Sequence, residues 1–142
     1  MEFFFFEEKF SIEVEKTIEE AELLTSAEFK LHIEEVCNEE VLDRAAFVFS
    51  ELELHKTEKR NAVLLYVSVN DRKVSILADA GAKAHLSEQF LSETLSTLIN
   101  DFKMNQYAQG IGNCFRIIAS ALKSNFPYQE NDINEISNTV SR

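Results

Sequence analysis

The apolar stretch from Ala62 to Val69, with the residues that follow it, predicts a β-hairpin. A run with so few polar interruptions is typical of a central strand that is covered on both faces. Asn70 and Asp71 then form a polar turn, and residues 73 to 78 return with alternating apolar and polar positions. Because a hairpin reverses the chain, we expect the end of the second strand to lie beside the start of the first.

Helical periodicity on both sides of this hairpin predicts four main helices, and alternation over residues 27 to 33 predicts one further, half-buried strand. The expected helix N-caps are Ser11, Asn38, Ser87 and Asn105, and Pro127 marks the end of the last helix. The order helix, strand, helix, strand, strand, helix, helix predicts a three-layer α/β/α sandwich. Its sheet is expected to be small and mixed, with about three to four strands.

The connections between these elements predict their relative directions. A strand, a helix and a strand in succession form a right-handed crossover, so we expect residues 27–33 to run parallel to residues 62–69. After the hairpin, Gly81 lies in an expected loop, where glycine permits a positive φ angle. We expect one domain over residues 10–128, preceded by a Phe-rich segment (1–9) and followed by a polar, flexible tail (129–142).

Composition narrows the range of partners. The 142 residues are 45% hydrophobic, which predicts a packed domain, and the net charge of -11 disfavours binding to nucleic acids or anionic lipids. Cations are the natural partners of such a surface, although acidic charge more often serves solubility alone. Cys37 and Cys114 are too few for a disulfide framework, and no run approaches the length of a membrane span. With no signal peptide in the opening MEFFFFEEKF, we expect a soluble, cytoplasmic protein.

Three oxygen-bearing side chains are expected to meet at one edge of the sheet. Glu28 opens the first strand, Asn61 precedes the second, and Asp79 follows the third. Oxygen ligands of this kind suit a hard divalent cation, calcium in particular, so we predict a metal site at Glu28, Asp79 and Asn61. The alternative is structural: Glu28 forms an ion pair with Arg60, and Asp79 caps its own turn.

Other candidate chemistry is weaker. Asp71, in the hairpin turn, is expected at the opposite edge near Glu34 and Glu35, where a second cation site is conceivable. His32, His55 and His85 have no metal-ligand spacing between them. The interval from Cys37 to Arg44 is one residue too long for the phosphate loop of cysteine phosphatases, and no other catalytic motif is present.

Several short segments, taken in order, resemble the TPM domain family. They are Thr25-Ser26-Ala27-Glu28, His55-Lys56-Thr57, Arg60-Asn61 before Val63-Leu64-Leu65-Tyr66, Asp71-Arg72-Lys73, Asp79 with Gly81, Phe102 with Tyr107 and Gly110, and Phe126-Pro127-Tyr128. The resemblance implies an α/β/α sandwich that binds a divalent cation, calcium in some members, and in some members acid phosphatase activity. The family usually has Gly at the positions of Ala27 and Ala62, and a bulkier residue at Ala82, so the resemblance favours metal binding over catalysis.

Three functions remain open from the sequence. The first is a soluble TPM-type module that binds a divalent cation in an accessory or regulatory role. The second is a metal-dependent acid phosphatase, in which Arg60 or Lys56 would neutralise the developing charge. The third is a protein interaction module that uses the Phe-rich start and the tail to contact a partner.

Overall fold

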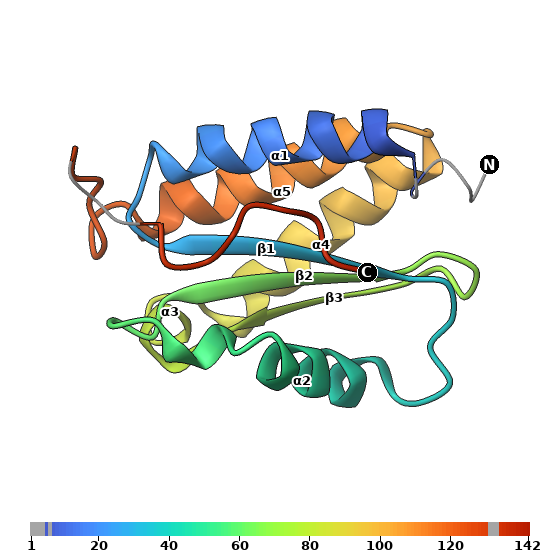
Figure 1. The fold of residues 1–142 in the computed structure, drawn as a ribbon, viewed down its shortest axis with the longest axis horizontal. Helices are drawn as coiled ribbons and strands as arrows, with labels where there is room; N and C mark the ends of the chain where they lie inside the picture. Colours follow the sequence, from blue (N-terminus) through green and yellow to red (C-terminus); the bar gives the residue numbers. More distant parts are fainter. Residues whose placement is uncertain (1–4, 6, 131–133) are drawn as a thin grey trace.

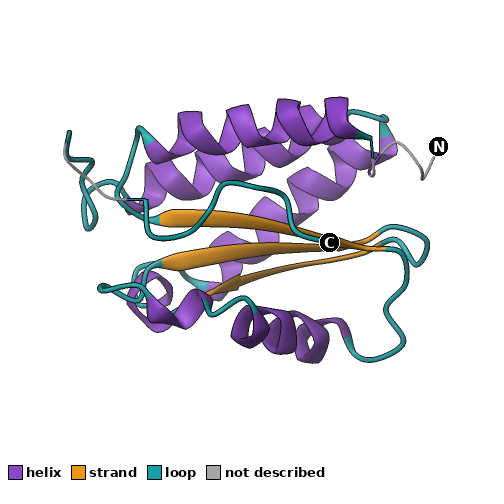
Figure 2. Ribbon diagram, viewed as in Figure 1, coloured by secondary structure: helices purple, strands orange, loops and turns teal. Residues whose placement is uncertain are grey.

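A computed structural model describes residue 5, residues 7–130 and residues 134–142. Three strands form one mixed sheet in the order β1-β2-β3, with β1 parallel to β2 and β2 antiparallel to β3. Helices lie on both faces of this sheet (Figures 1 and 2), which confirms the predicted three-layer sandwich. The elements are α1 (Glu8–Glu22), β1 (Glu28–Glu34), α2 (Val41–Glu51), the 3-10 turn η2 (Leu54–Lys56), β2 (Ala62–Ser68), β3 (Lys73–Ala78), α3 (Ala80–Lys83), α4 (Glu88–Lys103) and α5 (Tyr107–Leu122).

The central position of β2 follows from its composition. All seven of its residues are buried, as predicted for a strand covered on both faces. Val63, Leu65 and Val67 belong to the core shared with α1, α4 and α5, whereas Leu64 and Tyr66 belong to the smaller core under α2. The sheet therefore has two apolar faces, and polar groups gather at its two ends.

Helix boundaries depend on caps, and the caps were predicted unevenly. Ser87 is the N-cap of α4, where its Oγ accepts a hydrogen bond from the Phe90 N–H at 3.0 Å. Asn38 does not cap α2; the carboxylate of Glu40 does, by accepting from two N–H groups of the first turn. Asn105 adopts a φ of 60° before α5 and does not cap it. The first helix begins before Ser11, at Glu8.

Gly81 is required for close packing rather than for a positive φ angle. It lies in the short helix α3 where we expected a loop, and none of the glycines has a positive φ. A Cβ atom at this position would lie 2.1 Å from the carbonyl oxygen of Lys59 and 2.7 Å from that of Arg60. The absence of a side chain thus lets α3 pack directly on the backbone that leads into β2.

The C-terminal segment, residues 134–142, part of the tail that we expected to be flexible, lies along the outer edge of β1 (red in Figure 1). The Ser141 N–H donates to the Leu31 carbonyl at 3.0 Å, and the Ile33 N–H donates to the Ser141 carbonyl at 2.9 Å. Ile136 and Val140 are buried. Because β1 is an edge strand, its backbone offers free hydrogen-bonding groups, and this segment satisfies some of them.

Within the Phe-rich start, the structure describes residue 5 and residues 7–9, and Phe5 is 4% exposed and belongs to the main core. Phe3, Phe4 and Phe6 lie outside the described residues, so a partner contact through them stays a prediction. In the described part of the chain, no helix combines the length and apolarity that a membrane crossing requires.

Candidate functional site

The chain ends predicted to converge do meet at one edge of the sheet, beside α3 in Figure 1. Glu28 lies opposite Ala62 in the parallel pair β1 and β2. The Asp79 N–H donates to the Ala62 carbonyl at 2.9 Å, which continues the antiparallel pairing one residue beyond β3. The backbone at Glu28 and the backbone at Asp79 thus flank the same residue of the central strand.

Asp79 uses both carboxylate oxygens in structural contacts. Its Oδ2 accepts from the Arg60 Nε at 2.6 Å, and its Oδ1 accepts from the Arg60 Nη2 at 2.8 Å. The Ala80 N–H also donates to Oδ1, so Asp79 caps α3. Burial raises the pKa of Asp79, but these hydrogen bonds outweigh burial and hold the pKa below its usual value. Arg60 thus binds Asp79 and not Glu28, and the capping role foreseen for Asp79 is present.

Asn61 joins the starts of the two parallel strands. Its side chain is buried, and its Nδ2 donates to the Ser26 carbonyl at 3.4 Å. Its backbone N–H donates to the Thr57 Oγ1 at 3.2 Å. The first contact holds the backbone of Ser26, two residues before β1, and the second holds Asn61 itself.

Glu28 is the least satisfied carboxyl group at this edge. It is 4% exposed, and its Oε1 accepts from the Ile136 N–H at 2.8 Å. Its Oε2 is buried and has no hydrogen-bond partner among the residues that the structure describes. Burial raises the pKa of Glu28 to about 7, and the charges of Glu22 and Glu135 add to this effect, although the backbone N–H groups of Ile136 and Glu135 oppose it.

Glu22, the last residue of α1, was not foreseen as part of the site. Its Oε2 accepts from the Phe29 N–H at 3.2 Å, and burial raises its pKa to about 7. Glu22 and Glu28 line one cavity of about 210 Å³ together with Ser26, Asn134 and Asn138. The Ser26 Oγ, like the Glu28 Oε2, is buried without a described hydrogen-bond partner. We call Glu22, Ser26 and Glu28 the acidic edge. It lies at the end of the sheet where β1 and β2 begin and β3 finishes.

The donor set of the acidic edge suits calcium better than zinc. Within the described residues, no group of three His, Cys, Asp or Glu side chains is placed to hold a metal ion. A cation here would therefore be held by two carboxylates together with hydroxyl, amide and water oxygens. Calcium accepts such all-oxygen ligand sets in flexible numbers, whereas zinc sites usually include histidine nitrogen or cysteine sulfur, which the acidic edge lacks.

At the opposite end of the sheet, the carboxylates of Asp71 and Glu34 already accept structural hydrogen bonds. The Asp71 Oδ2 accepts from the Cys37 N–H at 2.8 Å. Glu34 accepts from the Arg44 Nε at 2.9 Å and from the Tyr66 hydroxyl at 2.6 Å. The hydrogen bond from Arg44 is the main reason why the pKa of Glu34 falls to about 2, although burial opposes it. These carboxylates already have partners, so this end is a weaker candidate for a cation.

The structure is a small α/β/α sandwich in which two carboxyl groups, Glu22 at the end of α1 and Glu28 at the start of β1, line one cavity. The chain belongs to the TPM domain family, whose profile matches residues 5–121, and the resemblance in sequence is thereby confirmed. No curated protein sequence matches the chain.

Two solved structures show how the fold recurs. The NMR structure of the BA42 protein from the psychrophilic bacterium Bizionia argentinensis superposes with a TM-score of 0.86 and 32% sequence identity. That alignment covers 94% of this chain and 92% of BA42. The N-terminal domain of a P. gingivalis protein, also solved by NMR, aligns with a TM-score of 0.64 and 14% identity over 82% of this chain and 75% of that one. At that identity the second match shows the fold alone.

Proposed function

We propose that this TPM domain binds a divalent cation, with calcium favoured, at the acidic edge and that it acts as an accessory or regulatory module. The observation that carries the proposal is the buried Oε2 of Glu28, which has no described hydrogen-bond partner. Glu28 lines a cavity together with Glu22, which supplies a second carboxyl group. A buried carboxylate oxygen without a hydrogen-bond partner is costly, and a bound cation offsets that cost directly.

The raised pKa values support the same proposal. Both carboxyl groups have pKa values of about 7, so near neutral pH each is partly protonated and the pair readily exchanges protons for a cation. Ser26 adds a hydroxyl, and Asn134 and Asn138 add amide groups from the C-terminal segment. A cation at the acidic edge would therefore also hold the C-terminal segment against β1.

Asp79 and Asn61, the other two predicted ligands, take different roles in this proposal. Asn61 holds the Ser26 backbone in place through its hydrogen bond to the carbonyl. Asp79 can contribute to an ion only if it gives up Arg60, which now binds both of its oxygens. Substitution of Glu28 thus tests the acidic edge itself, whereas substitution of Asp79 tests whether the ion site extends to Asp79.

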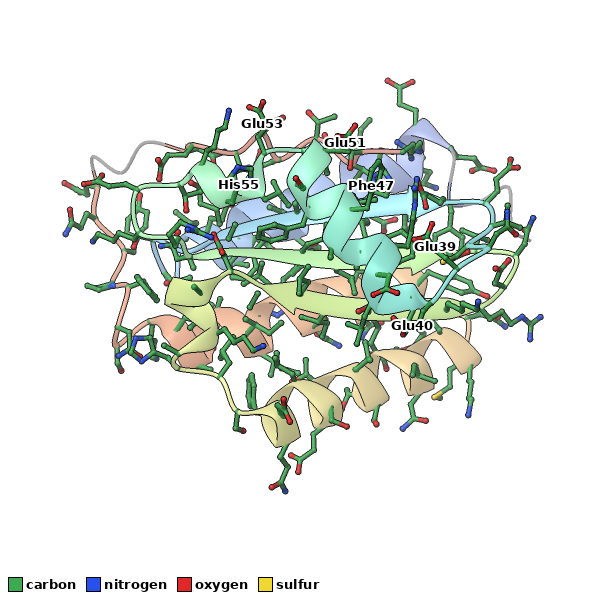
Figure 3. The ribbon with its side chains drawn as sticks, turned by 90° about the horizontal axis from the view of Figure 1, so that it is seen from below. Glu39, Glu40, Phe47, Glu51, Glu53 and His55 are labelled. Carbon is green, nitrogen blue, oxygen red and sulfur yellow. The ribbon has the colours of Figure 1, made fainter. Side chains whose placement is uncertain are left out.

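Calorimetric titration of calcium tests the proposal. We expect saturable binding to the wild type, loss of binding in Glu28→Gln, and a smaller loss in Asp79→Asn. Glu51→Gln is the matched control, because Glu51 is an exposed acid on α2 (Figure 3), on a different part of the molecule. Equal heats for the wild type and Glu28→Gln, or no heat in either, would refute the proposal.

The alternative function is a metal-dependent acid phosphatase, and one observation favours it. A carboxyl group with a pKa of about 7 is suited to proton transfer near neutral pH, and the acidic edge contains two. The cations foreseen for charge neutralisation are engaged elsewhere: Arg60 with Asp79, and Lys56 with Glu53 at 3.3 Å. Phosphate release from an aryl phosphate that depends on metal and is lost in Glu28→Gln would support this function, and release that is insensitive to chelator would exclude it.

A further inference from the structure

A second cavity, of about 400 Å³, opens at the end of the sheet opposite the acidic edge. The sheet contributes Val67, Val69 and Val74 to its lining, near the turn between β2 and β3. The helices contribute Ile99 and Phe102 from α4 and Tyr107 from α5. The lining is thus mainly apolar, and the volume is typical of a site for a small molecule.

An aromatic wall gives this cavity a preformed shape. The ring of Phe5 lies 4.9 Å from that of Tyr107 and 6.0 Å from that of Phe102, both in edge-to-face geometry. Phe102 and Tyr107 are themselves 5.3 Å apart. The backbone of Phe5 is held in addition, because its carbonyl accepts from the Arg142 Nη2 at 2.9 Å. The wall is therefore built from three separate parts of the chain and needs no ligand to form.

The charge around this cavity is opposite to that of the protein. The chain contains 25 acidic residues, yet no acidic side chain lines the cavity in the part of the molecule that the structure describes. Two exposed basic side chains, Arg72 and Lys103, line it instead. Neither of them forms an ion pair with any described residue, whereas Arg44, Lys56 and Arg60 all do.

We propose that this cavity binds a small amphipathic anion: a carboxylate with an apolar tail of medium length, bound as a free molecule. The apolar tail would occupy the space between Val74, Ile99 and the aromatic wall. The carboxylate would lie at Arg72 and Lys103, neither of which forms an ion pair with a described residue. In a protein of net charge -11, an apolar cavity whose charged lining residues are both basic selects for a negative head group.

Decanoate is a suitable probe, and decanol is its matched neutral counterpart. Each probe is titrated into the isotopically labelled full chain, and the amide chemical shifts show where it binds. Chelator is present throughout, so that no cation bound at the acidic edge contributes to the shifts. We expect saturable shifts with decanoate at residues around Val69, Val74 and Tyr107, and much weaker binding of decanol. Shifts confined to other parts of the molecule, or equal binding of decanol, would overturn the proposal.

Two variants separate the head group from the tail. Arg72→Gln with Lys103→Gln is expected to weaken decanoate binding by at least about tenfold, because both charges are lost. The control pair Lys83→Gln with Lys123→Gln removes the same charge from exposed lysines outside the cavity and should leave binding unchanged. Ile99→Trp, which fills the cavity, should abolish binding while the fold is retained.

One competing occupant comes from the chain itself. If decanoate binds only after residues 2–4 are deleted, the cavity belongs to the Phe-rich start and the proposal is overturned. If both the full chain and the shortened chain bind decanoate in a manner sensitive to Arg72 and Lys103, the proposal stands.

Discussion

The replacement Glu28→Gln is predicted to stabilise the domain at pH 8 in the absence of cations while it removes cation binding. The amide has the shape of the carboxyl group, and its oxygen can still accept from the Ile136 N–H, which now donates to the Glu28 Oε1 at 2.8 Å. What changes is the charge on a group that is 4% exposed and whose Oε2 has no described partner. The substitution thus removes the cost of burying a carboxylate.

The magnitude follows from the pKa of Glu28, which rises from 4.5 in the unfolded chain to about 7 in the folded domain. Below pH 4.5 both states hold the proton, and the residue has no effect on stability. Between pH 4.5 and 7 the unfolded state releases its proton first, so the wild type loses stability as the pH rises. Above pH 7 the full loss is about 3 kcal/mol, at about 1.4 kcal/mol for each pH unit of pKa difference. The Gln variant escapes this loss.

Urea unfolding in chelator at pH 4, 6 and 8 measures this effect. We expect equal stability of the wild type and Glu28→Gln at pH 4 and a widening advantage for the variant toward pH 8. Calcium at pH 8 should then stabilise the wild type and leave the variant unchanged, because binding to the folded state alone raises its stability. A variant that is less stable than the wild type at pH 8 in chelator would refute the reasoning, since Glu28 would then be a stabilised carboxylate. Glu51→Gln, with its exposed side chain, should show neither effect.

Three further predictions concern the scaffold. Deletion of residues 134–142 should lower the free energy of unfolding by about 2 to 4 kcal/mol in a denaturant titration, because apolar burial is lost. The same deletion should weaken calcium binding, and an unchanged calcium affinity would show that this segment does not contribute to the site. Gly81→Ala should cost about 3 kcal/mol or more in thermal unfolding, because its Cβ would collide with the Lys59 carbonyl. Tyr66→Phe should cost about 1 to 2 kcal/mol at pH 7 through loss of the hydrogen bond to Glu34, and a neutral result in urea would contradict it.

The parts of the fold that depend on periodicity were predictable. The nearly continuous apolar run of β2 and the alternation of β3 predicted the hairpin, and the crossover rule predicted the direction of β1. The return of Asp79 beside Arg60 followed from the same reasoning, and the ion pair between them confirms it. The structural alternative paired Arg60 with Glu28, and this pairing is wrong, because the partner of Arg60 depends on side-chain direction and not on backbone register.

The parts that depend on short polar segments were not predictable. Glu22 lies six residues before Glu28, and only the geometry of the turn between α1 and β1 shows that they share a cavity. The C-terminal segment has a polar composition without a regular period, so its contact with β1 through Ser141 left no signal in the sequence. In both cases the segment is held by backbone hydrogen-bonding groups of the edge strand β1 that no other strand pairs with. The sequence pattern does not show which polar residues will bind these groups.

The most direct test of the central claim is a crystal structure determined at pH 8 in the presence of calcium, with anomalous scattering used to locate the ion. We predict a calcium ion at the acidic edge, about 2.3 to 2.6 Å from the Oε2 of Glu28, with an oxygen of Glu22 also within coordination distance. Both carboxyl groups free of calcium at saturating concentration, or the ion bound instead at Asp71 on the opposite end of the sheet, would contradict the claim.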